Sequence, residues 1–563
     1  FEKAIQIKPN FVEAYYNLGN VQKEQNDFKT AIESYKNAIR TQPNYMEAHN
    51  NLGLVYKEQG DLESAIASYL RALKINPRYV EAWNNLAFSL QAFKLQGSPF
   101  DMFLASAPKE IFSSYGRIAA SVLRYKLELG GSASQSALDE ALDLLSGAED
   151  LVIKNPGLSK DIIPLSVSLP YEIVSLVHFG RSGTGLLHSL IDGHSEISTL
   201  PSIYFSEFFD HSTWEEIIAG GWSEMADRFS DLYAVLFDAW SSYPVSTKSK
   251  KLLYDIGQKE GMANVGNGRD EVLRVDKEVF CSELKGLMAS YAELDAFGFF
   301  KLVHKAHDKA INALTQKRLI FYHIHNPDAY AKLNFLRSAP KTRWIMMVRE
   351  PIQSCESWIR GEFYDGEYSI TCARIITMLF EIDEVIYAQS GSVGVRLEDL
   401  KEHPRKTIPA LCKWLGVREE ESLYEMTAQG KKWWGDPSSP DYEKDGMEPF
   451  GTTSLRRKVG SIFSESDQFV LRTLFYPFSV RFGYTEENSE QFEVDLKTIR
   501  PMLEQMFDFE KILVERTGAD TEQFMNSGSY LYLRSGLIQR WSILNEFKTY
   551  PNMIAPLQID GLV

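Results

Sequence analysis

A period of 34 residues runs through the first hundred residues of this chain and restricts its fold more than any other feature. Proline recurs at this spacing at Pro9, Pro43 and Pro77. The same period relates further alanine, leucine and tyrosine positions: Ala14, Ala48 and Ala82; Leu18, Leu52 and Leu86; and Tyr35 and Tyr69. Repeats of this kind bury their apolar faces only by stacking on their neighbours. The pattern therefore predicts a solenoid over residues 1–95.

The residues at these positions resemble the tetratricopeptide repeat. In that family two antiparallel helices per repeat place small residues at their close crossings, and here the triplet Asn-Leu-Gly at 17–19 returns at 51–53. The resemblance implies an all-α solenoid whose concave face binds a protein or peptide, or else repeats that only solubilise or dimerise the chain. Phe1 lies 34 residues before Tyr35, so we expect further repeats upstream.

Composition and charge exclude several classes of protein. Hydrophobic residues make up 44% and charged residues 24% of the chain, as in soluble globular proteins. No segment approaches the roughly 20 apolar residues that span a bilayer. A net charge of −16 disfavours nucleic-acid binding, although local donors can still bind a small anion. The scattered cysteines predict neither a disulfide framework nor a zinc knuckle, and favour the cytoplasm: Cys281, Cys355, Cys372 and Cys412.

A strand, a glycine-rich turn and a helix follow one another after residue 171. Residues 172–179 form a short, β-rich apolar run, 180–185 contain three glycines, and 186–191 carry leucines at helical spacing. This geometry points backbone N–H groups and a helix N-terminus at a phosphate. The loop lacks the GxxxxGK[ST] spacing, so magnesium-dependent hydrolysis of a nucleoside triphosphate is not implied.

The loop and the helix after it resemble the 5′-phosphosulfate loop of sulfotransferases, in particular the protein-tyrosine and carbohydrate branches. The likeness rests on Arg181-Ser182-Gly183-Thr184 and on the segment 190–194. These enzymes use 3′-phosphoadenosine 5′-phosphosulfate (PAPS), leave 3′-phosphoadenosine 5′-phosphate (PAP) and need no metal. The resemblance implies that the loop residues bind the cofactor: Arg181, Ser182, Gly183, Thr184, Gly185 and Leu186.

Four later segments match the same family in order. The strand 342–348 ends at Arg349, Ser357 follows eight residues later, and 395–400 and 412–417 match the next strand end and helix. The resemblance implies that Arg349 and Ser357 hold the 3′-phosphate, as a guanidinium fork and a hydroxyl can. It further implies that a late basic loop covers this phosphate: Arg456, Arg457, Lys458 and Gly460.

The general base is predicted from position. The strand 318–324 runs into His325, which lies 24 residues before Arg349, near the distance at which the family carries its base. An imidazole that titrates near neutrality can accept the proton of an alcohol. His323 and Glu207 remain alternatives. Arg181 is expected to stabilise the bridging oxygen as it becomes phosphate.

Four positions depart from the family's pattern. Ser202 stands where the protein-tyrosine branch has its glutamate, and Gly185 replaces a threonine of the loop. Leu186 and Leu397 stand where other members carry the aromatic residues that contact adenine, so the adenine platform must come from elsewhere.

The sequence as a whole predicts an all-α solenoid followed by an α/β, P-loop-like sulfotransferase fold with a central parallel sheet flanked by helices. We expect repeats at 1–95, a helical bridge at 96–170, the sulfotransferase domain at 171–485 with a helical insertion at 215–316, and a helical cap at 486–563. The predicted activity is sulfuryl transfer from PAPS to a hydroxyl or amine of a protein or saccharide, with the repeats recruiting substrate or partner. The alternative is a repeat scaffold with an inactive P-loop-like domain.

Overall fold

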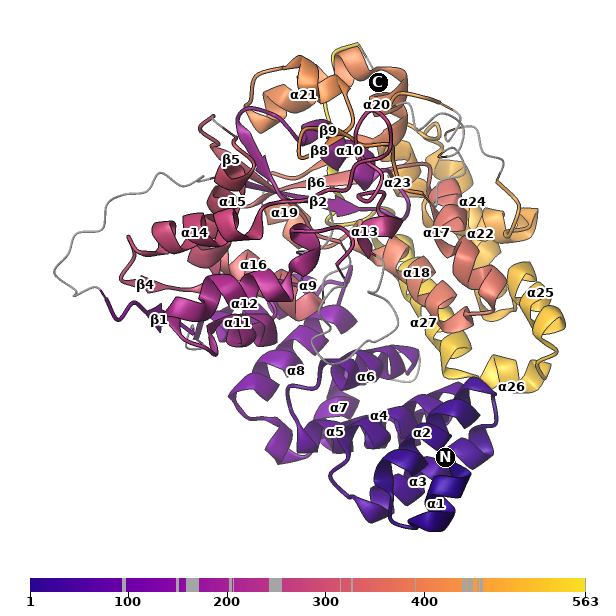
Figure 1. Cartoon of the computed structure of the whole chain (residues 1–563). Coiled ribbons are helices and arrows are strands. Elements are labelled where there is room, and N and C mark those ends of the chain that lie inside the picture. The colour runs from indigo at the N-terminus through magenta and orange to yellow at the C-terminus, as the bar shows by residue number, and fades with distance from the viewer. Residues whose placement is uncertain are drawn as a thin grey trace. The chain divides into compact units, whose positions relative to one another are not determined.

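The chain forms two compact units in a computed structural model (Figure 1). The first unit comprises 1–148, 351–385 and 459–553, and the second comprises 149–350, 386–458 and 554–563. The structure describes these residues: 1–93, 98–147, 151–157, 172–201, 205, 207–241, 256–313, 315–325, 328–389, 391–437, 442, 449–452, 455 and 459–561.

Antiparallel helix pairs make up the start of the first unit, as the 34-residue period predicts. The helices are α1 (Glu2–Ile7), α2 (Val12–Glu24), α3 (Phe28–Thr41), α4 (Met46–Glu58), α5 (Leu62–Ile75) and α6 (Val80–Ala92). Asp27 and Asp61, one period apart, cap α3 and α5 by accepting the backbone N–H of the third helical residue. The buried ring of Tyr35 packs against Gly19 of the preceding helix, and the buried ring of Tyr69 packs against Gly53 in the same way. The period therefore encodes both the caps and the closest helix crossings.

The rest of the first unit is also helical. It contains α7 (Pro99–Ser106), α8 (Ser114–Leu127), α9 (Ser134–Gly147), α17 (Pro351–Asp365), α18 (Tyr368–Glu381), α22 (Glu465–Leu474), α23 (Tyr476–Arg481), α24 (Ser489–Ile499), α25 (Asp508–Thr517), α26 (Thr521–Asn526) and α27 (Gly528–Phe547). The C-terminal region in this unit is helical, and α7, α8 and α9 lie within the predicted bridge at 96–170, which also contains the short strand β1 (Ile153–Lys154).

The long helix α27 closes the end of the repeat stack. It packs against both α6 and α18. The ring of Tyr532 stacks on Phe88 of α6 with 3.8 Å between centroids, and Ser535 donates to the carbonyl of Gln91. Farther along α27, the fully buried Arg540 pairs with the fully buried Asp383 at 2.9 Å. A terminal repeat needs such a cover because its outer face has no following repeat to pack against.

A six-stranded parallel sheet lies at the centre of the second unit, as predicted. Its order is β10-β7-β6-β2-β5-β3, and every pairing is parallel. The strands are β2 (Glu172–His178), β3 (Ile197–Thr199), β5 (Leu319–His323), β6 (Arg343–Val348), β7 (Val393–Arg396) and β10 (Ala555–Pro556). The last strand corrects one expectation, because the C-terminal tail is not wholly helical: its end extends the sheet beside β7.

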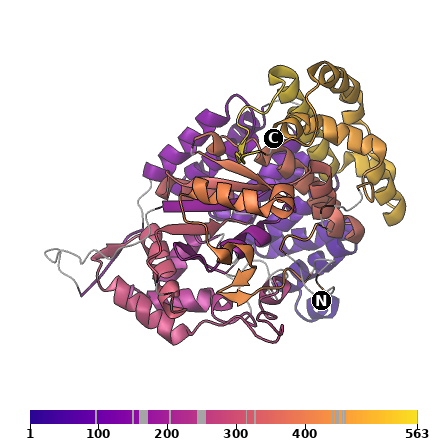
Figure 2. The ribbon, with the colours of Figure 1, turned by 90° about the horizontal axis from the view of Figure 1, so that it is seen from above.

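Helices cover both faces of this sheet. The helices of the second unit are α10 (Thr184–Ile191), α11 (His211–Ile218), α12 (Met225–Leu232), α13 (Ile256–Lys259), α14 (Lys277–Met288), α15 (Ala296–Ala310), α16 (Ala329–Ser338), α19 (Ile386–Gln389), α20 (Leu397–Glu402) and α21 (Pro404–Leu415). Leu176 of β2 and Phe321 of β5 join a buried cluster with side chains of α10 and α21, and α21 lies in front of the strands in Figure 2. Tyr322 on the opposite face contacts aromatic rings of α15 and α16.

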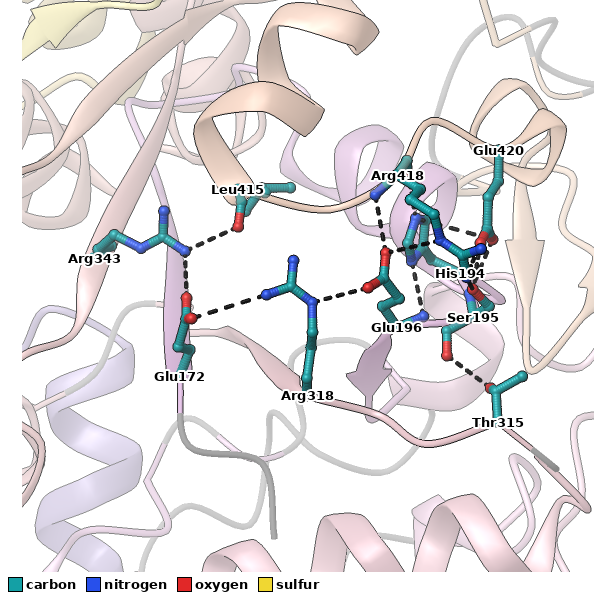
Figure 3. Close-up of polar contacts among 10 residues, drawn as sticks. All are labelled: Glu172, His194, Ser195, Glu196, Thr315, Arg318, Arg343, Leu415, Arg418 and Glu420. Atoms are coloured by element: carbon teal, nitrogen blue, oxygen red, sulfur yellow. Dashed lines mark hydrogen bonds and ion pairs between the residues drawn. The ribbon is translucent and has the colours of Figure 1, made fainter. Parts of the chain in front are cut away.

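Charged residues tie together the amino ends of the strands (Figure 3). Glu172, which begins β2, pairs with Arg343 of β6 at 2.9 Å, and Arg318, just before β5, pairs with Glu196 at 2.9 Å. Glu196 also accepts the backbone N–H of Arg418, and this bond, together with Arg318, lowers the pKa of its carboxyl. These partly exposed pairs fix strand register at the edge of the sheet opposite the glycine-rich loop.

A buried polar network lies beneath the edge strand β3. Ser198 contacts His304 Nδ1 at 3.1 Å, and His307 Nε2 lies 3.1 Å from the amide nitrogen of Gln429. Burial lowers the pKa of His304 to about 3 and that of His307 to about 4, whereas burial raises the pKa of Asp308 to about 6. Both histidines are therefore neutral near pH 7, whereas the Asp308 carboxyl takes up its proton only near pH 6.

Substitution of Gly53 by alanine is expected to lower the thermal unfolding midpoint. An added Cβ would lie 2.5 Å from Cε1 of the buried Tyr69, and overpacking of this kind costs about 1 to 3 kcal/mol. Gly361→Ala is the matched control, because a Cβ at this helical position meets nothing within 4 Å. Differential scanning calorimetry should show a lower midpoint for Gly53→Ala alone. Equal midpoints would contradict the close crossing.

The stability of the chain should fall as the pH drops from 6.5 toward 4. Unfolded His307 takes up a proton at its ordinary pKa of 6.5 but folded His307 only near 4, so the unfolded chain binds more protons between these values. This shift corresponds to about 3 kcal/mol. His307→Gln should flatten the pH dependence of the unfolding midpoint. Asp308→Asn should steepen it, because the folded carboxyl takes up its proton near pH 6, before the unfolded one does. Superimposable pH curves would argue against both assignments.

Candidate functional site

The glycine-rich loop joins the end of β2 to the start of α10. Gly180 and Gly183 both have positive φ values, of 58° and 90°, and Gly183 is the N-cap of α10. The buried Ser182 hydroxyl accepts the backbone N–H of Phe179, which closes the turn on itself. Glycine adopts these φ values without strain. Strand, loop and helix thus follow in the predicted order, and the loop faces the N-terminus of a helix.

Two side chains from later in the chain pack against the loop. A Cβ on Gly183 would lie 2.7 Å from Cδ1 of Leu397, and a Cβ on Gly185 would lie 3.4 Å from Cη2 of Trp433. Trp433 is buried, and its indole N–H donates to the carbonyl of Glu260. Sequence reasoning missed Trp433, for which the only signal was the adjacent pair of tryptophans at 433–434. These contacts explain why small residues stand at both loop positions.

Arg349 reaches the loop from the neighbouring strand. It directly follows β6, which pairs with β2 so that Met347 stands opposite His178. The Arg349 side chain is 4% exposed, and its Nη1 donates to the carbonyl of Arg181 at 3.4 Å. Arg181 itself is exposed. The structure therefore brings together two of the arginines that the sequence assigned to the cofactor.

Four histidines gather at the carboxyl ends of β2 and β5. The ring centroids of His178 and His325 are 5.2 Å apart, those of His325 and His323 are 5.9 Å apart, and those of His323 and His188 are 5.7 Å apart. His178 ends β2, His323 ends β5, and His188 lies on α10. Both predicted histidine candidates thus belong to one group, which we call the histidine cluster. Sequence reasoning missed His178 and His188.

Burial governs the protonation of the histidine cluster. His178, His188 and His323 are between 4% and 7% exposed, and His325 is half-buried. Desolvation, followed by the proximity of His188, His325 and His178, holds the pKa of His323 well below its ordinary value. Desolvation also lowers the pKa of His188, against the opposing charge of Asp192. Neither ring nitrogen of His323 has a hydrogen-bond partner within the described part of the chain.

Glu207, the third candidate base, has a different environment. It lies in a turn before α11 and is exposed at its surface. Desolvation of its carboxyl raises its pKa, and the nearby carboxylates of Asp210 and Asp328 raise it further. Because its pKa is raised, the Glu207 carboxyl is a weaker acid than that of an ordinary glutamate.

The remaining predicted contacts fall outside this group of residues. Ser357, on α17, and Gly460 belong to the first unit, where the buried carboxylate of Glu356 accepts the backbone N–H groups of Gly460 and of 461–463. The pairing of Ser357 with Arg349 stays a prediction. Arg456, Arg457, Lys458 and Ser202 lie outside the described residues.

The described residues contain no group of three or more histidine, cysteine or acidic side chains arranged to hold a metal ion. The four cysteines are buried and form no disulfide. In the same part of the chain, no helix combines the length and the apolarity that crossing a bilayer would require.

Comparison with known proteins identifies the first region. Family models described as "TPR repeat" and "Tetratricopeptide repeat" match residues 19–60 and 54–92, and residues 1–33, respectively. Residues 1–92 are tetratricopeptide repeats. Repeats of this family generally mediate protein–protein contacts through the concave surface of the stack.

The comparisons say less about the second unit. A search of curated proteins found no match. Among the solved structures that match is the sulfotransferase domain from the Synechococcus PCC 7002 olefin synthase, at 17% sequence identity, with 56% of this chain and 98% of that chain covered. The TM-score is 0.32, too low to establish a shared fold. The α/β architecture therefore rests on the strand order and register of this chain.

Gly183→Ala should distort the loop. The new side chain would be strained at a φ of 90° and would clash with Leu397. A left-handed non-glycine residue costs about 1 to 2 kcal/mol before any clash is counted. The double variant Gly183→Ala, Leu397→Ala should regain only the stability that the clash costs. A double-mutant cycle on the unfolding midpoint separates this part from the cost of the backbone strain. Strict additivity of the two substitutions would count against this contact.

Proposed function

We propose that the chain is a PAPS-dependent sulfotransferase that transfers a sulfuryl group to a hydroxyl or amine of a protein or saccharide. One observation carries the proposal: a glycine-rich phosphate loop, a buried arginine that reaches it and a histidine cluster lie at the carboxyl edge of neighbouring parallel strands. This edge is where open α/β sheets bind their ligands.

The loop and its arginines fit an anionic cofactor. Residues 180–185 combine positive-φ glycines with the N-terminus of α10, which favours negative charge. Arg181 lies in the loop and is assigned to the phosphosulfate, and the buried Arg349 beside the loop is assigned to the 3′-phosphate. PAPS, when bound, supplies the sulfuryl group and the phosphate leaving group. We assign Ser182, Thr184, Gly185 and Leu186 to the lining of this site.

His325 is the proposed general base. It is the half-buried member of the histidine cluster, whereas His323 is buried and strongly desolvated. A base must reach the acceptor as well as bind a proton, and His325 is the more accessible of the two histidines. Glu207 lies near Asp210 and Asp328 and outside the histidine cluster, and it stays an alternative base. Arg181 would stabilise the negative charge that develops on the bridging oxygen.

The repeat region is proposed to recruit the acceptor or a partner protein. In this view the 3′-phosphate contacts from Ser357 and the segment 456–460, the cytoplasmic location and the choice between protein and saccharide acceptors all stay predictions. The alternative function is a repeat scaffold with an inactive P-loop-like domain. It is favoured by one observation: Leu397, which stands at a position where other members have an aromatic residue, fills the space against Gly183.

Calorimetric titration with PAP in EDTA, with AMP and ADP as controls, tests the proposal. We expect micromolar binding that depends on the 3′-phosphate, and Arg349→Ala should weaken it by about 1.5 to 3 kcal/mol, the contribution of a charge-assisted contact. Arg405→Ala is the matched control, because Arg405 is an exposed arginine paired with Glu421 on the same unit. Equal binding of PAP and ADP would favour the scaffold.

Transfer of radiolabelled sulfate from PAPS to tyrosine peptides and to saccharides tests the catalytic roles. Arg181→Ala and His325→Ala should each abolish transfer, while circular dichroism stays unchanged. Full activity of His325→Ala would transfer the role of base to His323 or Glu207.

A further inference from the structure

The histidine cluster is a consequence of strand register. Leu176 of β2 pairs with His323 of β5, and Ile324 donates its backbone N–H to Leu176, so His178 and His325 come to stand beside each other at the next step. Side chains alternate between the faces of a strand, which puts His323 and His325 on the same side as Leu176 and His178. That side is the one covered by α10, from which His188 contributes its ring.

The separations in the cluster make its members titrate together. The rings follow one another in the order His178, His325, His323 and His188, at 5.2, 5.9 and 5.7 Å between centroids. Two positive charges at such distances in a desolvated site repel strongly, so the first proton disfavours the second. Groups coupled in this way share macroscopic pKa values that belong to the set.

Two buried members of the cluster, His323 and His188, have ring nitrogens without a hydrogen-bond partner in the described residues. His323 is 4% exposed, and neither of its ring nitrogens has a partner in the described residues, while His188 likewise leaves Nε2 without one. A buried polar nitrogen without a partner is costly unless a ligand, a water or a proton-sharing neighbour satisfies it. The cluster therefore has unused capacity to donate and accept hydrogen bonds next to the phosphate loop.

The charged groups on the surrounding elements are of both signs. Asp192 follows α10 and acts on His188. Arg181 lies in the loop, and Arg349 follows β6. Asp328, three residues after His325 in the chain, caps α16 and acts on Glu207. An anion bound at the loop would add negative charge on the side of the two arginines.

We propose that His178, His188, His323 and His325 act as one unit that holds a single proton taken from the acceptor, and that this proton leaves the site together with PAP. The inference rests on the proposed function. His325 contacts the acceptor, while His178, His323 and His188 are positioning residues that share the charge and fix the ring of His325.

The transfer moves one proton to the histidine cluster and one sulfuryl group to the acceptor. The acceptor O–H bond breaks and its proton moves to a ring nitrogen of His325, while the acceptor oxygen forms its new bond to sulfur. The bond between sulfur and the phosphate oxygen of the cofactor breaks, and its electron pair stays on that oxygen. The chain is left with one positive charge in the histidine cluster next to the phosphate of PAP. Attraction between the two holds both until release.

This arrangement has a thermodynamic consequence that needs no acceptor. PAP that binds to the resting chain adds a phosphate beside the histidine cluster and raises the affinity of the cluster for a proton. Binding of PAP should therefore be accompanied by uptake of about one proton near neutral pH. The affinity for PAP should rise as the pH falls, by up to tenfold per pH unit while uptake is complete, and should level off at high pH.

Calorimetry of the full chain with PAP, at one pH in buffers of different ionisation enthalpy, measures this uptake. The slope of the binding enthalpy against the ionisation enthalpy gives the number of protons. We expect about one proton for the wild type. His178→Asn and His325→Asn should each lower the uptake by at least half, although only His325 contacts the acceptor. His403→Asn is the matched control, because His403 is exposed and lies outside the cluster, and its uptake should equal that of the wild type.

The outcomes separate this inference from the proposed function. Failure of the wild type to bind PAP would overturn the proposed function, and the inference with it. Binding of PAP without proton uptake, or uptake that His178→Asn leaves intact, would overturn the inference alone. Dependence of the uptake on added Zn²⁺ would also overturn it, because a metal ion would then be the true partner of the rings.

A second measurement covers the case in which a variant fails to fold. The wild-type chain labelled with ¹³C-histidine can be titrated by NMR with and without PAP. The inference requires that PAP raise the titration midpoint of histidines in the cluster together and leave that of His403 unchanged. A midpoint shift confined to one histidine would mean that a lone base, rather than a cluster, takes the proton.

Discussion

The hydrogen-bond register of β2 with its two neighbours is the constraint on which the rest of the second unit depends. β2 lies between β5 and β6, and both pairings are parallel. Parallel pairing carries all the carboxyl ends to one edge, so the glycine-rich loop, Arg349 and the histidines meet there although up to 171 residues separate them in sequence. A slip of one residue in either pairing would turn His323 or Arg349 to the other side of the sheet.

The two edges of the sheet differ in their electrostatic character. The amino edge carries partly exposed ion pairs such as that of Arg343 with Glu172, which water screens. The carboxyl edge has buried imidazoles, among which burial keeps His323 neutral. Water exclusion strengthens every interaction at that edge. The proposed sulfuryl transfer is therefore assigned to the carboxyl edge of the sheet, where water is excluded.

In the repeats of the first unit, each helix pair packs only against the pairs next to it. Its closest crossings depend on a glycine opposite a buried tyrosine, at Gly19 with Tyr35 and at Gly53 with Tyr69. The stack would end on an uncovered face, and α27 supplies the cover through Tyr532 and Ser535, which contact Phe88 and Gln91 of α6. A helix from the C-terminal part of the sequence thus covers the face of the last repeat, which has no following repeat to pack against.

The sequence alone determined the repeats and the strand–loop–helix order around Gly183, because each depends on spacing within a short segment. The parallel sheet was predicted from the family resemblance. It also indicated His323 and His325 as candidates, but treated them as alternatives. Only the tertiary structure decided that His178 and His188 join them, that Leu397 and Trp433 pack against the loop, and that 555–556 extend the sheet. These contacts join residues far apart in the chain, and no local pattern specifies which strands lie side by side or which turn of a helix faces them.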